Sequence, residues 1–94
     1  MNIEQRDSPS KGSFVALEGD VTAGTLVYSW SGDRTFTILH TEVDPVFSGK
    51  GVGKQLILAA VELARKDGLK IKLLCPFAKR VFERSSELRD VLFT

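Results

Sequence analysis

Three glycines at alternating positions, Gly49, Gly51 and Gly53, stand at the start of a predicted helix together with Lys50 and Lys54. Glycine lets the backbone approach a ligand closely. The free N–H groups and the dipole of a helix N-terminus favour an anion. The pattern therefore predicts an anion-binding loop, most simply for phosphate. The alternative is a flexible turn whose glycines only let the chain enter the helix.

Two familiar phosphate loops do not fit this stretch. A Walker A loop needs glycine where Ser48 stands and serine or threonine where Gln55 stands. The dinucleotide-binding fingerprint needs a third small residue where Leu56 stands. The loop is therefore predicted to hold phosphate in neither of these two ways.

A second group of reactive side chains lies at the ends of two predicted strands. Alternation places His40 and Glu42 on one face of the strand 35–43, and Cys75 ends the strand 70–75. Ligands of open α/β sheets bind at such strand ends. Because histidine could take the proton of a neighbouring thiol, we predict Cys75 as a candidate nucleophile and His40 or Glu42 as a candidate base. The alternative is a buried, chemically inert cysteine and an ordinary strand histidine.

The elements that must position these residues change character midway along the chain. Strands are predicted over residues 13–18, 21–30 and 35–43, with turns between them, so an antiparallel three-strand meander is expected. Apolar residues then recur at helical spacing over 52–67, before the strand 70–75. Strand, helix and strand form a right-handed βαβ unit with parallel strands.

The ends of the chain complete the predicted domain. Pro76 suits the first turn of a new helix, which is predicted over residues 77–84. A short final helix is expected over residues 86–92. Residues 1–12 are polar and are predicted to form a flexible N-terminal arm. The expected fold is therefore a single α/β domain over residues 13–94, with a mixed sheet and C-terminal helices.

Composition excludes several classes of protein. The chain has 94 residues, of which 43% are hydrophobic and 27% charged, as expected for one globular domain. A single cysteine excludes an intramolecular disulfide, and with a single histidine it argues against a structural zinc site, so no metal is predicted. The sequence shows no apolar stretch long enough to span a membrane and no apolar signal-peptide core. The expected location is the cytoplasm, without a membrane partner.

Charge is unevenly distributed. Residues 45–82 carry eight basic and two acidic side chains, a net charge of +6, whereas the whole chain has +1. Such a field could attract an anionic ligand, although charges of this kind more often form a solvated surface. The aromatic residues Phe47 and Phe77 are not interleaved with the basic ones, so nucleic-acid binding is not favoured.

Four stretches of the sequence together resemble the small, single-domain branch of the GNAT N-acetyltransferases, the YjdJ-type proteins. In chain order they are residues 40–45 (HTEVDP), 49–56 (GKGVGKQL), 68–71 (GLKI) and 75–79 (CPFAK). The resemblance covers about residues 13–92. Ser48 departs from the arginine or glutamine that opens the glycine motif of this family, which removes one side chain that could contact phosphate.

This resemblance implies a GNAT fold that uses acetyl-CoA as cosubstrate and an amine as acceptor. Its residues for the cofactor would be Thr41, Val43, Gly49, Lys50, Gly51, Val52, Gly53 and Lys54. The acetyl end would approach residues 41–43 and Cys75. The amine would attack the thioester directly, with His40 or Glu42 as base, or Cys75 would first accept the acetyl group. The alternative function is a non-catalytic acetyl-CoA sensor or interaction module. The chain is expected to be a monomer or a weak dimer.

Overall fold

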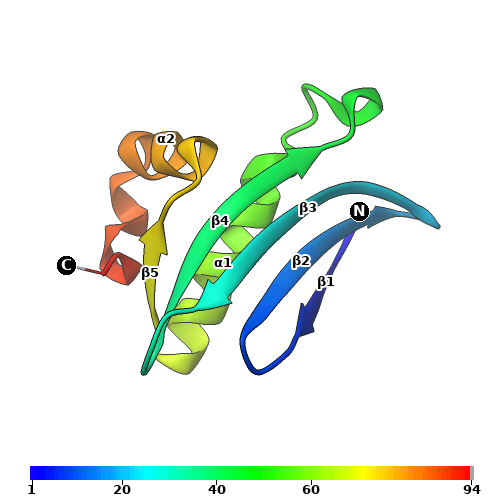
Figure 1. Ribbon diagram of the computed structural model, residues 1–94. Coiled ribbons are helices and arrows are strands. Elements are labelled where there is room, and N and C mark those ends of the chain that lie inside the picture. Colours follow the sequence, from blue (N-terminus) through cyan, green and yellow to red (C-terminus); the bar gives the residue numbers. More distant parts are fainter. Residues whose placement is uncertain (94) are drawn as a thin grey trace.

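The computed structural model describes residues 1–93, which form one five-stranded sheet with helices beside it (Figure 1). The sheet order is β1-β2-β3-β4-β5, with antiparallel pairing from β1 to β4 and parallel pairing of β4 with β5. The elements are β1 Asn2–Asp7, β2 Lys11–Glu18, β3 Val21–Trp30, β4 Thr35–Val43, α1 Val52–Asp67, β5 Lys70–Leu73 and α2 Pro76–Arg84, with short 3-10 helices η1 Pro45–Phe47 and η2 Ser86–Val91. The predicted α/β class, meander and βαβ unit are confirmed.

The helix α1 packs on the sheet because its apolar residues fall on one side. Leu56, Ile57 and Ala60 are fully buried, as are Leu26 and Tyr28 on β3. Glycines in the left-handed region stand at both ends of the helix: Gly51 has φ 75° and Gly68 has φ 67°. The predicted helix 52–67 is therefore confirmed at both ends. No helix among residues 1–93 is long and apolar enough to cross a lipid bilayer.

The prediction of a flexible arm over residues 1–12 is wrong. Residues 2–7 form the edge strand β1, and β2 already begins at Lys11. Polar side chains of β1 reach across β2 to β3: Asp7 Oδ1 accepts hydrogen bonds from Tyr28 Oη at 2.8 Å and Trp30 Nε1 at 2.9 Å. Gln5 Nε2 donates to Tyr28 Oη at 2.9 Å. These polar residues are thus partners of a buried tyrosine, which their composition alone does not reveal.

The Tyr28 cluster predicts a loss of stability in alkali. Burial, together with the hydrogen bond to the carboxylate of Asp7, raises the pKa of Tyr28 to about 12. In the unfolded chain the same phenol loses its proton at about pH 10. The unfolded state therefore releases this proton first, and the free energy of unfolding should fall as pH rises from about 10 to about 12.

Denaturant titrations across this pH range measure the effect. Tyr28 is the single tyrosine of the chain, so Tyr28→Phe is the matched control and should have a smaller alkaline loss of stability. Equal losses in the two proteins would show that other groups, such as lysines, cause the decline.

Candidate functional site

A β-bulge in β4 decides which side chains share a face of the sheet. Val27 pairs with His40 and the next residue, Tyr28, pairs with Ile38, so Leu39 has no opposite residue. The extra residue reverses the alternation beyond Ile38. Thr41 and Val43 consequently lie on the face that α1 covers, opposite Leu26 and Gly24 of β3, while His40 and Glu42 are exposed on the other face.

The bulge separates His40 from Cys75, so the predicted pairing of these two side chains is wrong. Cys75 Sγ donates instead to Thr41 Oγ1 at 3.7 Å. The thiol lies at the position just before α2, and the residue is only 3% exposed. Among residues 1–93, no titratable side chain hydrogen-bonds to Cys75. The structure therefore places no base beside the thiol.

The strands β4 and β5 diverge after Ile38. Their parallel register ends at the pair Ile38–Leu73, and the N–H groups of Leu74 and Cys75 both donate to the Ile38 carbonyl, at 3.0 and 3.2 Å. The chain then turns away into α2, while β4 continues to Val43 (Figure 1).

This divergence leaves one edge of β4 without a neighbouring strand. The N–H of Asp44 donates to the Ala23 carbonyl of β3 at 2.8 Å. Because successive backbone groups alternate in direction, those of Thr41 and Val43 point the other way, toward the side that β5 has left. The end of β4 can therefore offer backbone hydrogen bonds to an extended ligand.

A cavity of about 720 Å³ lies between the end of β4, the start of α1 and one side of α2. It is lined by Val43, Pro45, Phe47, Ser48, Gly49, Gly51, Val52, Gly53, Lys54, Phe77, Arg80, Val81, Arg84 and Ser85. Six of the residues predicted for the cofactor are in this wall. The cavity wall does not include the other predicted site residues, Thr41, Lys50, His40, Glu42 and Cys75. The Lys50 ammonium instead lies 5.5 Å from the centre of the Phe47 ring.

The glycines of the loop serve different purposes. Gly49 and Gly51 have φ values of 80° and 75°, a conformation that side chains rarely adopt, and a Cβ at either position would meet open space. Gly53 is buried, and a Cβ there would lie 2.7 Å from the Phe77 ring. Gly53 therefore lets α2 pack closely against the start of α1, which forms one corner of the cavity.

The helix start supplies unpaired N–H groups to this cavity. The N–H of Gln55 donates to the Gly51 carbonyl at 3.0 Å, the first hydrogen bond within α1. The N–H groups of Val52, Gly53 and Lys54 precede that bond and so have no acceptor within the helix. Together with the helix dipole, they form a site suited to an anion.

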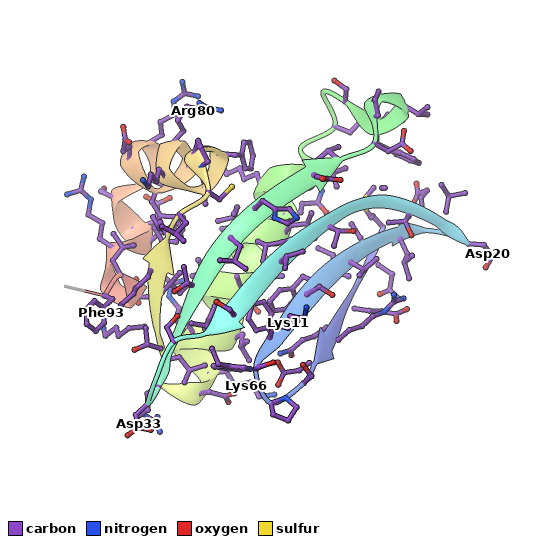
Figure 2. All side chains as sticks on the ribbon, viewed as in Figure 1. Lys11, Asp20, Asp33, Lys66, Arg80 and Phe93 are labelled. Atoms are coloured by element: carbon purple, nitrogen blue, oxygen red, sulfur yellow. The ribbon has the colours of Figure 1, made fainter. Side chains whose placement is uncertain are left out.

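Three cations and no acid line the cavity: Lys54 from α1, and Arg80 and Arg84 from α2. In the described part of the chain none of the three is in an ion pair. Figure 2 shows Arg80 projecting outward from α2, at the end of the molecule where the loop before α1 also lies. Arg80 lies within the basic region 45–82, whereas Arg84 lies just outside it and was not predicted as a site residue, although their spacing of four residues puts both on one side of a helix.

Known proteins resemble this chain in sequence. Residues 13–91 match the profile of the family described as GCN5-related N-acetyl-transferase. Protein NATD1 of Xenopus tropicalis is 30% identical over 76 residues, which are 81% of this chain and 70% of that protein.

Solved structures show the same fold. A GCN5-like protein from Staphylococcus aureus has a TM-score of 0.74 and 31% identity, covering 98% of this chain and 89% of its own. A Bacillus anthracis protein solved in complex with acetyl coenzyme A has a TM-score of 0.60 and 26% identity, covering 71% of this chain and 39% of its own. The chain therefore belongs to the GCN5-related N-acetyltransferase (GNAT) family, as the resemblance implied, and it is a small N-acetyltransferase by family and by fold.

Proposed function

We propose that this protein transfers the acetyl group of acetyl-CoA to an amine, and that the cofactor lies in the cavity between α1 and α2. One observation carries the proposal: the unpaired N–H groups at the start of α1 line a cavity that contains three cations and no acid. A phosphate-bearing ligand fits this wall because its charge meets both the helix dipole and the cations. The similar protein that was solved with acetyl coenzyme A supports the same ligand.

The pantetheine arm of the cofactor would lie along the free edge of β4. Its amide groups would form hydrogen bonds with the backbone of Thr41 and Val43. The backbone N–H and C=O groups of these two residues point away from β3. The thioester would then lie where β4 and β5 diverge. A backbone N–H of β4 would donate to the acetyl carbonyl and stabilise the negative charge that develops there during transfer.

Direct attack is the route that this geometry favours. The amine nitrogen forms a bond to the acetyl carbon, the carbon–sulfur bond breaks with its electron pair on sulfur, and the CoA thiolate takes up a proton to become the thiol. The amine loses a proton to a base, for which His40 and Glu42 on the uncovered face of β4 are our candidates. Transfer through Cys75 is the less favoured route, because Thr41 rather than a base is the side chain that bonds the thiol.

A transfer assay tests this proposal. Release of the CoA thiol is followed with a panel of small amines, peptide N-termini and lysine peptides, with acetylated product identified by mass. Product that depends on both acetyl-CoA and an amine supports the proposal. Tight binding of acetyl-CoA without product from any acceptor class would favour the alternative function, a binding module without turnover.

Lys54 should contribute a salt-dependent part of the affinity. Its side chain lines the cavity and is exposed, and an exposed charge contact is worth about 1 kcal/mol or less. Lys54→Ala should therefore weaken acetyl-CoA binding up to about fivefold and flatten the dependence of Kd on ionic strength.

Two other lysines serve as controls for this variant. Lys66 lies in the last turn of α1, and Lys50 lies over the Phe47 ring, outside the cavity wall. Lys66→Ala and Lys50→Ala should leave Kd and its salt dependence close to those of the wild type in calorimetric titrations. An equal loss in all three variants would mean that the protein attracts the ligand only through its overall charge.

A further inference from the structure

Two arginines on α2 form a second cationic group on the cavity wall, distinct from the start of α1. Arg80 and Arg84 are four residues apart on the helix Pro76–Arg84, and both line the cavity. Side chains at this spacing lie one above the other on the same face of a helix. Both are exposed, and neither is in an ion pair within residues 1–93. No acidic side chain of residues 1–93 therefore neutralises the charge of these two arginines.

The two cationic groups differ in chemistry. The start of α1 offers backbone N–H groups and the ammonium of Lys54. Such a site suits a phosphate within a chain, such as a pyrophosphate, which the backbone can approach closely. Guanidinium groups are planar and bind the oxygens of a terminal phosphate in pairs. A ligand that uses both groups must carry two separated anionic groups. CoA does so, because it bears a pyrophosphate in its chain and a phosphomonoester on the 3′ position of its ribose.

We infer that Arg80 and Arg84 bind the 3′-phosphate of CoA and make this chain discriminate CoA from its 3′-dephospho form. The inference rests on the proposed function, since it assigns a role to residues of the same cavity. The pyrophosphate lies at the start of α1, and the 3′-phosphate lies against α2. Arg84 also stands in the last turn of α2, where a cation stabilises the helix dipole. That effect changes stability but gives no preference between the two cofactors.

The test compares acetyl-CoA with acetyl-3′-dephospho-CoA by calorimetric titration at one low salt concentration. The wild type should bind acetyl-CoA about tenfold more tightly or better, because charge-assisted hydrogen bonds to the extra phosphate are lost in the dephospho form. In a variant that combines Arg80→Gln with Arg84→Gln, the ratio of the two Kd values should fall close to one. The change should come mainly from weaker binding of acetyl-CoA.

Lys79→Gln is the matched control. Lys79 is an exposed cation next to Arg80 on the same helix, but it is not in the cavity wall. This variant should keep the wild-type preference, and thermal unfolding curves should show that each variant is folded.

The outcomes separate this inference from the proposed function. Equal affinities of the wild type for the two cofactors would overturn the inference and leave the proposed function standing. A preference that survives in the double arginine variant, or that Lys79→Gln also abolishes, would overturn the assignment to Arg80 and Arg84. Absence of binding of either cofactor to the folded wild type would contradict the proposed function itself.

Discussion

Replacing Gly51 with aspartate should raise the Kd for acetyl-CoA at least about 100-fold, because the new carboxylate would meet the cofactor phosphates at the start of α1. Two unit charges about 4 Å apart repel by about 4 kcal/mol near a protein surface, and each 1.4 kcal/mol is a factor of ten. Gly51 stands directly before α1, and a Cβ built there meets open space. The carboxylate would therefore occupy the site without displacing any part of the protein. Titration calorimetry measures the effect.

Gly51→Asn is the matched control for this variant. Aspartate and asparagine have nearly the same shape, and both tolerate the left-handed conformation that Gly51 adopts at φ 75° better than most residues do. Backbone strain and bulk are therefore similar in the two variants, and only the charge differs. Gly51→Asn should bind acetyl-CoA within about tenfold of the wild type, and both variants should unfold cooperatively. Equal losses of affinity in the two would mean that phosphate does not lie at this helix start.

Removing both candidate bases should produce a large loss of catalysis without loss of binding. A general base contributes about 10²- to 10⁴-fold to the rate. His40 and Glu42 are exposed on the face of β4 opposite to Thr41 and Val43, and neither lines the cavity. A variant that combines His40→Gln with Glu42→Gln should therefore lower kcat at least about 100-fold while its Kd for acetyl-CoA stays within about twofold of the wild-type value. Steady-state kinetics and calorimetry on the same preparations give both quantities.

Cys75→Ala distinguishes direct attack from transfer through the thiol. Direct attack predicts that this variant keeps most of its activity, because Cys75 only fills space between Thr41 and the start of α2. Intact-mass analysis after mixing the wild type with acetyl-CoA alone should show no acetyl group on Cys75. Loss of transfer in Cys75→Ala, together with an acetyl adduct on the wild-type thiol that an amine discharges, would contradict direct attack and establish the covalent route.

The parts of the fold that depend on local pattern were predictable from the sequence. The helix 52–67 was predicted with its observed bounds, because its apolar residues repeat with a helical period and Gly68 terminates it. The strands 21–30 and 35–43 also have the predicted bounds. One part of the cavity wall was also predictable, because its residues follow one another closely in the sequence. These residues are Gly49, Gly51, Val52, Gly53 and Lys54.

Features that depend on two distant segments were not predictable in this way. The bulge at Leu39 arises from the pairing of β3 with β4. The sequence of β4 alone contains no residue that marks the position of this bulge. The error over His40 and Cys75 follows directly from this one residue. The edge strand β1 was missed because its polar residues are satisfied by Tyr28 and Trp30, more than twenty positions away.

The most direct test of this account is a calorimetric titration of the folded wild-type protein with acetyl-CoA at low ionic strength. We predict saturable one-to-one binding whose affinity falls as salt is added, because phosphates meet the helix start and the three cations of the cavity wall. Gly51→Asp, titrated in parallel, should give no saturable heat. An absence of binding to the folded wild type under these conditions, or binding that Gly51→Asp leaves intact, would contradict the claim that this cavity holds the cofactor.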